Sequence, residues 1–295
     1  ADAGQAGPQY RRQPSGSGRK QQCPGLPQDK GDKEMGQWRG DAQTDNLRAE
    51  QAVCQRQYPG DQRWAWLHVS SRRSTEYTMT ESLSLRITEV FTSLQGEALT
   101  SGLPTTFIRL TGCPLRCVYC DSEYAFQGGE HHSIAGLVAQ VADAGVPRVC
   151  VTGGEPLAQP NCWFLLTALC DAGFEVSLET SGAMDITDVD SRVSVVLDVK
   201  TPGSGESSKN LASNLTRLQS KDQIKVVVTS ADDFRWFELF CDEHPEVVHA
   251  GAIWISPSYG EMDLKILADL IVQSRHPFRM QLQLHKQIWG EESGR

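Results

Sequence analysis

Three cysteines stand close together in this sequence, at Cys113, Cys117 and Cys120. Thiolates are soft ligands that suit iron and zinc. A structural zinc ion takes four protein ligands, and the nearest further candidates, His131 and His132, lie outside this tight spacing. Three thiolates on a four-iron cubane leave one iron open, so that the cluster can bind and transform another molecule. The triplet therefore predicts either an open iron–sulfur cluster or a zinc site completed by His131 or a distant cysteine.

A glycine pair followed by a carboxylate lies further along the chain, in the segment TGGEP at residues 152–156. Glycine allows the backbone to come close to a ligand. Exposed carbonyls around Gly153 and Gly154, together with the Glu155 carboxylate, would suit an ammonium group. Taken alone, the segment is better explained as an ordinary Gly-Gly turn before a helix.

Arg109 lies in the middle of an apolar run, FIRL at residues 107–110. A buried guanidinium is costly unless it meets an anion. Arg109 is therefore expected to meet an anion, which can belong to a ligand or to an acidic side chain of the protein.

Alternating strand and helix patterns indicate how these residues are positioned. Such alternation over 79–295 predicts parallel β–α–β units, and six to seven mostly parallel strands favour a partial, open β/α barrel of the α/β class. Working residues in such barrels sit where strands end, which places Cys113, residues 152–155, residues 179–182, Lys200 and Ser256 on one rim. The predicted strands are 105–111, 148–153, 175–180, 193–200, 223–230, 251–256 and 278–284.

Helices are predicted between many of these strands. Apolar residues at 134, 137, 138 and 141 share one helical face, with Ser133 as the N-cap. A second helix is predicted to begin at Asn161 and to stop at Gly173. Residues 231–243 and 262–275 also fit helices. The connections 181–192 and 201–222 lack the periodicity of full helices.

Composition narrows the classes of function. The chain has 295 residues, is 39% hydrophobic and carries a net charge of -9. The excess of acidic residues lies entirely in 79–295. An acidic globular part argues against binding to a phosphate backbone, so no nucleic-acid partner is expected. No run approaches the ~20 apolar residues of a membrane helix, and no apolar signal-peptide core is present. A cytoplasmic location without membrane attachment is predicted.

Residues 1–78 differ in amino-acid composition from the rest of the chain. They are rich in Gln, Gly, Ser, Arg and Pro without a sustained apolar period, which favours a disordered extension. An alternative is upstream sequence translated by mistake, with Met79 as the natural start. The odd count of nine cysteines argues against a disulfide framework. Four of them lie in apolar patterns and are expected to pack as small hydrophobes: Cys150, Cys162, Cys170 and Cys241.

The motifs taken together resemble those of a known family. The cysteine triplet with Tyr119 before its last member, followed by the GGEP segment, is similar to the radical S-adenosylmethionine (SAM) superfamily. Four further segments resemble the 7-carboxy-7-deazaguanine synthase family over about residues 84–295. These are EVFTSLQGE at 89–97, FIRLTGC at 107–113, CDS at 120–122 and LHKQIWG at 284–290.

The resemblance implies a radical SAM core domain at 79–295 and a carbon–nitrogen lyase of queuosine biosynthesis. The family converts 6-carboxy-5,6,7,8-tetrahydropterin to 7-carboxy-7-deazaguanine with loss of ammonia. A reduced [4Fe–4S] cluster cleaves SAM to a 5′-deoxyadenosyl radical that takes a hydrogen from the substrate, and Mg²⁺ assists. The resemblance also implies an external reductase of the flavodoxin or ferredoxin type, and a homodimer.

The family's site residues carry over onto matching positions. The cysteine triplet becomes the cluster ligand set, and Ser122 takes the place of a magnesium-binding threonine, keeping the hydroxyl; a plain N-cap serine is the alternative. Ala98 stands where the family usually has glycine. The implied SAM-binding residues are Tyr119, Cys120, Asp121, Gly154, Glu155, Glu179, Ser181, Asp198, Lys200 and Ser256. The implied substrate-binding residues are Leu94, Gln95, Gly96, Glu97, Arg109, Thr152 and His285.

Three other interpretations stay open at this point. A glycyl-radical-activating enzyme would share the triplet but should lack the QGE segment, the mid-strand arginine and the segment at 284–290. A zinc-binding interaction module would need no SAM. A catalytically idle family member would not keep every motif. Lys200, at a strand end, could also be an ordinary solvated lysine.

Overall fold

The computed structural model describes residues 83–290, 292 and 294. The segment 1–78 and Met79 lie outside the described residues. The described part is built on a nine-stranded sheet in the order β3-β1-β2-β4-β5-β6-β7-β8-β9. Its strands are β1 (Ser84–Leu94), β2 (Pro104–Leu110), β3 (Glu130–Ser133), β4 (Arg148–Gly153), β5 (Glu175–Thr180), β6 (Ser194–Asp198), β7 (Gln223–Val228), β8 (Ala252–Pro257) and β9 (Phe278–Met280).

Seven of these strands, β2 and β4 to β9, run parallel to one another. The sheet stays open, because β3 and β9 are its two ends. The expected partial barrel and its seven parallel strands are therefore confirmed. Parallel strands need crossovers, and helices supply these between β2 and β4, β4 and β5, β7 and β8, and β8 and β9.

The sequence prediction missed two strands, β1 and β3, which pair antiparallel with each other. β1 also pairs antiparallel with β2. β3 has only four residues, EHHS, and contains His131 and His132. It has no apolar pattern of its own, so its strand conformation depends on hydrogen bonding to β1 rather than on burial.

The helices are α3 (Ile134–Ala144), α4 (Cys162–Asp171), α5 (Ala231–Glu243), α6 (Leu264–Gln273) and α7 (Leu284–Trp289). Ser133 caps α3 as predicted, since its hydroxyl accepts from the backbone N–H of Gly136 at 3.1 Å. Asn161 does not cap α4; its side-chain amide donates instead to the Ser84 carbonyl at 2.9 Å. No described helix is both long and apolar enough to span a bilayer.

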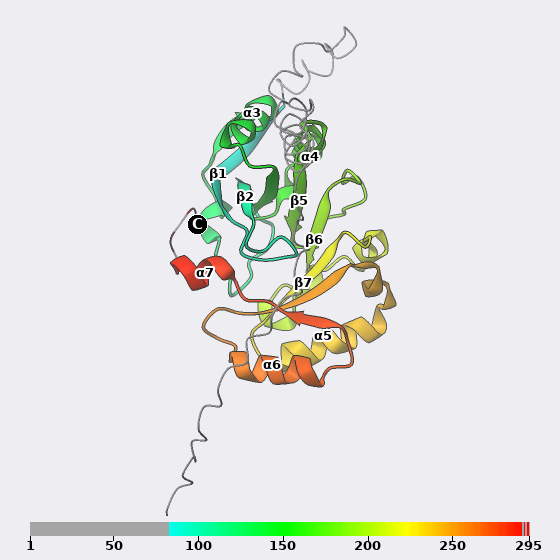
Figure 1. Ribbon diagram of the computed structural model, residues 1–295. Coiled ribbons are helices and arrows are strands. Elements are labelled where there is room, and N and C mark those ends of the chain that lie inside the picture. The colour runs from blue at the N-terminus through cyan, green and yellow to red at the C-terminus, as the bar shows by residue number, and fades with distance from the viewer. Residues whose placement is uncertain (1–82, 291, 293, 295) are drawn as a thin grey trace, which may run out of the picture. The chain divides into compact units, whose positions relative to one another are not determined.

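Short 3-10 turns occupy the remaining connections, and within 181–192 and 201–222 no full helix forms in the described chain, as expected. The turns are Glu123–Phe126, Pro156–Ala158, Pro202–Ser204, Ser207–Lys209, Ala212–Arg217 and Pro245–His249. In Figure 1, α5 and α6 lie together below β7, whereas α7 lies apart from them, toward β1.

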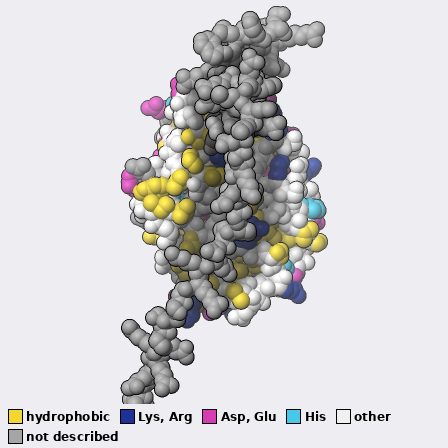
Figure 2. Space-filling model, viewed as in Figure 1, with side chains coloured by type: hydrophobic (Ala, Val, Ile, Leu, Met, Phe, Trp, Pro, Cys, Tyr) yellow, Lys and Arg dark blue, Asp and Glu magenta, His cyan; other side chains and the backbone are white. Residues whose placement is uncertain are grey.

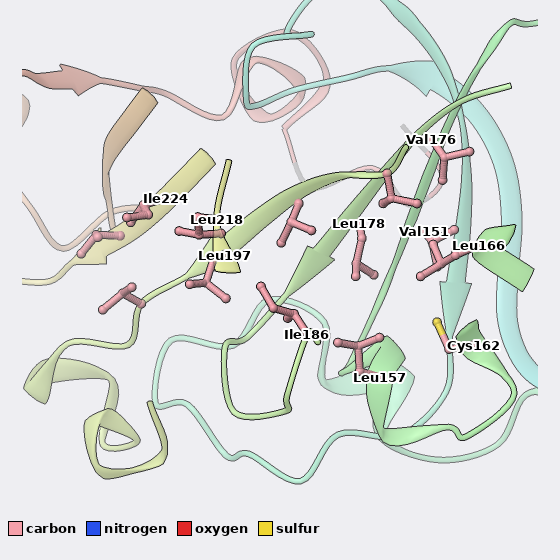
Figure 3. Close-up of a cluster of buried hydrophobic side chains, with 14 of the residues drawn as sticks. Val151, Leu157, Cys162, Leu166, Val176, Leu178, Ile186, Leu197, Leu218 and Ile224 are labelled. Atoms are coloured by element: carbon pink, nitrogen blue, oxygen red, sulfur yellow. The ribbon is translucent and has the colours of Figure 1, made fainter. Parts of the chain in front are cut away.

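The hydrophobic core crosses the sheet from strand to strand. Figure 3 shows Val151, Leu178, Leu197 and Ile224, from four successive parallel strands, following one another in a row. All four are at most 2% exposed, and each such side chain contributes about 1.5–3 kcal/mol by burial. This packing holds the strands in register, so that their carboxyl ends face the same space.

Of the four cysteines expected to pack as small hydrophobes, Cys150, Cys162 and Cys241 are buried, and Cys170 is half-buried. On the uncovered part of the face in Figure 2, charged side chains of both signs are scattered among hydrophobic patches. This mixed surface fits a chain with a net charge of -9.

Candidate active site

The carboxyl ends of the parallel strands open into a cavity of about 770 Å³. Its size lies within the range of small-molecule sites. Of the predicted site residues, only Glu155 lies outside its lining among the described residues. The others line it together: Leu94, Gln95, Gly96, Glu97, Arg109, Cys113, Cys117, Tyr119, Cys120, Asp121, Ser122, Thr152, Gly154, Glu179, Ser181, Asp198, Lys200, Ser256 and His285.

The cysteine loop begins directly after β2. All three thiols are free and half-buried. Burial raises their pKa values, and the Lys200 ammonium acts in the opposite direction. No three or more His, Cys, Asp or Glu side chains of the described residues converge on a point where one ion could bind. A cubane spreads its thiolates over separate iron atoms, so a cluster does not need such a point.

Arg116 stabilises the cysteine loop by hydrogen bonds to its backbone. Its guanidinium donates to the carbonyls of Cys113 at 2.8 Å and Leu115 at 2.6 Å, and it lies 4.2 Å from the ring centroid of Phe126. Its backbone N–H donates to the Glu206 carboxylate at 2.6 Å. These contacts fix the loop between its first two cysteines.

The glycine pair at the end of β4 packs directly against the start of the cysteine loop. A Cβ on Gly154 would meet the Gly112 carbonyl, and one on Gly153 would meet the backbone of Leu110. Gly153 also has a φ of 153°, which favours glycine. The glycine pair therefore lets the two backbone segments pack closely together, and the expected approach to a ligand stays a prediction.

Glu155 lies fully buried behind this turn. Its carboxylate accepts hydrogen bonds from the Leu157 backbone at 3.0 Å, the Thr180 hydroxyl at 2.9 Å, and both the backbone N–H and the hydroxyl of Ser181. The sequence predicts that this carboxylate faces a ligand's ammonium group, but in the structure it faces the protein interior. It joins the end of β5 to the glycine turn and so shapes the cavity wall.

Several buried polar atoms at the β6 and β8 ends lack a hydrogen-bond partner among the described residues: the Tyr119 hydroxyl, the Ser256 hydroxyl and Asp198 Oδ1. Leaving such a group unpaired costs about 1–3 kcal/mol, so this part of the cavity suits a polar ligand. Burial, together with Asp198, raises the pKa of Tyr119 strongly. The tyrosine therefore stays a hydrogen-bond donor.

Lys200 is buried and pairs with Asp198 at 2.9 Å. The alternative of a solvated lysine at this strand end is therefore wrong. Its Nζ also lies 5.9 Å from the centroid of the Tyr119 ring. The ammonium group is thus directed into the cavity beside the cysteine loop.

A set of hydrogen-bonded side chains, centred on Glu179, connects the ends of β1, β4 and β5. Glu179 accepts from the Gln95 side chain at 3.3 Å and from the Thr152 hydroxyl at 2.9 Å. Both donors are predicted substrate-binding residues, whereas Glu179 was assigned to SAM by resemblance. The structure places Glu179 directly against the predicted substrate-binding residues.

Arg109 forms the internal salt bridge that was left as an alternative. Its Nε donates to Glu89 at 2.7 Å, and the same Glu89 oxygen accepts from the Tyr124 hydroxyl at 2.8 Å. The guanidinium lies 6.0 Å from the Phe91 ring centroid and 5.8 Å from that of Tyr124. Because this pair uses Nε, it does not occupy the two Nη groups that bind a carboxylate side by side.

Helix α7 closes one side of the cavity. The Leu284 N–H donates to the Gly96 carbonyl at 3.0 Å, and the His285 ring packs where a side chain on Gly96 would lie. Lys286 pairs with Asp121 at 2.8 Å and, against the effect of burial, holds the pKa of that carboxyl well below its usual range. The Ser122 hydroxyl donates to Asp121 at 2.9 Å and makes no N-cap hydrogen bond.

Comparison with known proteins places this geometry in a family. The model of the radical SAM superfamily matches residues 107–197. The 7-carboxy-7-deazaguanine synthase of Chlorobaculum tepidum is 38% identical over 218 residues, which cover 73% of this chain and 99% of that protein. The synthase of Methanospirillum hungatei is 45% identical over 210 residues, covering 70% and 87%. This chain belongs to the 7-carboxy-7-deazaguanine synthase family.

The crystal structure of QueE from Escherichia coli shares the fold, with a TM-score of 0.61 at 23% identity over 74% of this chain and 100% of that one. Membership of the synthase family, within the radical SAM superfamily, brings with it a [4Fe–4S] cluster and SAM. The half-buried thiol triplet and the unpaired polar atoms beside it fit these two groups.

Sequence reasoning about this synthase family member missed the charged partners of two predicted site residues. Lys225 in β7 lines the cavity and contacts Glu97, and Glu89 in β1 pairs with Arg109. A lysine inside the run QIKVVV gives the same signal that singled out Arg109, a charge within an apolar strand. Glu89 could be found only from the β1–β2 register, which sets it opposite Arg109.

Proposed function

We propose that this chain converts 6-carboxy-5,6,7,8-tetrahydropterin to 7-carboxy-7-deazaguanine with loss of ammonia, as a radical SAM carbon–nitrogen lyase. The relatives are named for this activity, and this chain matches 99% and 87% of their lengths. The observation that carries the proposal is that the cysteine triplet and the residues matching the family's substrate-binding positions line the same cavity.

The cofactor half of the cavity is formed by the cysteine loop and by the ends of β4, β5, β6 and β8. We assign Cys113, Cys117 and Cys120 as the cluster ligands. When bound, the cluster supplies the electron that splits SAM into methionine and a 5′-deoxyadenosyl radical. The unpaired atoms of Tyr119, Asp198 and Ser256 would hold SAM by hydrogen bonds, with further contacts from Cys120, Asp121, Gly154, Ser181 and Lys200. Glu155 would support this wall from behind.

The substrate half lies between β1, β2 and α7. The Nη groups of Arg109 suit the carboxylate of the pterin, and Glu89 fixes the plane of that guanidinium. Gln95, Glu97, Thr152 and Glu179 supply polar contacts to the ring, together with the backbone of Leu94 and Gly96. His285 closes this half from α7 and excludes water, which strengthens each polar contact inside.

Mg²⁺ is proposed to bind at Ser122, next to Asp121. Mg²⁺ prefers oxygen ligands and keeps several waters, and this part of the lining offers a hydroxyl and a carboxylate. The matching family position is the support for this assignment. A flavodoxin or ferredoxin as reductase and a homodimer as the assembly are proposed from the same resemblance.

The decisive experiment is anaerobic incubation of the reconstituted protein with dithionite, SAM and the carboxytetrahydropterin. We expect 7-carboxy-7-deazaguanine to form without net consumption of SAM. Release of 5′-deoxyadenosine alone would leave only the superfamily chemistry and reject this substrate. A protein that takes up zinc and no iron would reject the enzyme altogether. Cys120→Ala is the control, and it should abolish both products.

A further inference from the structure

Lys225 stands in the middle of β7 and is the lysine that sequence reasoning left without a role. Its side chain is 15% exposed, and its Nζ contacts Oε2 of Glu97. Glu97 follows β1, so the contact joins two segments that are 128 residues apart in the chain. Both residues line the cavity.

Glu97 uses only one of its two oxygens in this ion pair. Oε1 is buried and has no hydrogen-bond partner among the described residues. A buried carboxylate oxygen without a donor is costly. Since Glu97 lines the cavity, a ligand N–H is the donor that this oxygen can receive there.

The charges around Lys225 explain why it stays an ammonium. Burial disfavours its charged form, but the carboxylates of Glu97, Asp198 and Glu179 outweigh this effect and raise the pKa of Lys225. The Lys225 ammonium in turn acts to lower the pKa of the neighbouring Lys200.

The loop that carries Glu97 is anchored without Lys225. The Leu99 N–H donates to the Gln223 side chain at 2.8 Å, and Gln95 exchanges two backbone hydrogen bonds with residues 102 and 103. Lys225 is therefore not needed to hold the backbone of this loop in place. Lys225 instead supplies the opposite charge beside the Glu97 carboxylate and fixes the direction of that side chain.

We propose that Lys225 is a positioning residue for substrate recognition, which holds Glu97 by its Oε2 and so turns its Oε1 toward an N–H group of the substrate. This inference rests on the proposed function, whose pterin offers ring and amino N–H donors. Lys225 itself acts through Glu97, and Glu97 makes the contact.

The test compares Lys225→Met, Glu97→Gln and the double variant by equilibrium dialysis of the carboxytetrahydropterin against the unreduced protein. Loss of one member of a buried charge pair should weaken pterin binding about 10-fold or more, while SAM binding changes less than about 3-fold. The double variant should bind pterin as Glu97→Gln does, because two residues acting through one contact are not additive. In turnover, Lys225→Met should raise KM and largely keep kcat.

Lys221→Met is the matched control. Lys221 pairs with Asp222 at 2.7 Å and donates to the Val193 carbonyl, away from the cavity lining, so this variant should lower the melting temperature and leave pterin binding unchanged. Unchanged pterin affinity in Lys225→Met, or full additivity in the double variant, overturns the inference. If Lys225→Met does not fold, the double variant leaves no unpaired buried charge and still decides the question by its match to Glu97→Gln. A wild-type protein that binds SAM but no pterin would instead refute the proposed function.

Discussion

Ion pairs lie in and beside this cavity, and they serve orientation more than stability. Removing two charges from water costs about as much as their attraction returns. What a pair gains is a fixed direction; in Glu97 and Asp198 the second oxygen has no hydrogen-bond partner among the described residues and stays available to a ligand. The pairs are Glu89–Arg109, Glu97–Lys225, Asp121–Lys286 and Asp198–Lys200.

Glu155 offers a prediction at this scale, because its carboxylate is satisfied entirely by the chain itself. Glu155→Gln replaces an oxygen that accepts from Ser181 or Leu157 with an NH₂ that faces a donor. We expect a loss of about 2–3 kcal/mol in the free energy of unfolding, measured by urea unfolding followed by circular dichroism.

The control for Glu155→Gln is Glu175→Gln. Glu175 pairs with Arg148 at 3.0 Å but is 65% exposed, and exposed pairs contribute roughly 0–1 kcal/mol. Equal stability losses in the two variants would contradict the structural role given to Glu155.

At the scale of elements, function depends on strand ends and on one short helix. The parallel strands bring the cysteine loop, the glycine turn and the ends of β5, β6 and β8 to one rim. Helix α7 then covers this rim from the far end of the chain, through Gly96 and Asp121. The helix has only six residues, so these contacts, and not its own hydrogen bonds, hold it in place.

Gly96→Ala tests this contact between elements. A methyl group at residue 96 would collide with the His285 ring, so we expect His285 and α7 to shift outward. Displacement of a substrate-positioning group by about 1 Å can cost up to about 100-fold in activity. The measurement is KM for the pterin, with 5′-deoxyadenosine release in its absence as a check on the cofactor half.

His285→Ala removes the collision partner of Gly96→Ala. The double variant should therefore match His285→Ala alone. If Gly96→Ala behaves as the wild type does, α7 is not held by this contact.

For the whole molecule, the described residues suggest that 79–295 suffices. The first strand begins at Ser84 and the described cavity lining begins at Phe91. The relative from Chlorobaculum tepidum matches 73% of this chain over 99% of its own length. We predict that a chain starting at Met79 keeps the cluster content, melting temperature and kcat/KM of the full chain. A loss in any of the three would assign a role to residues 1–78.

The sequence by itself determined the parallel strands, four of the helices and a set of site residues of which all but Glu155 line the cavity. Continuous apolar runs can be buried on both faces only in a covered parallel sheet. Once the strands are parallel, their carboxyl ends must meet on one rim. For this reason the cysteine triplet, the glycine turn and Lys200 were placed together correctly before any contact was known.

Tertiary structure alone decided the partners. Glu89 meets Arg109 only through the β1–β2 register, β3 exists only because β1 pairs with it, and Lys225 finds Glu97 across 128 residues. Glu155 turned inward because Thr180 and Ser181 offered it donors. Local patterns record which residues are buried, but the choice of a buried charge's partner depends on which distant segments pack beside it.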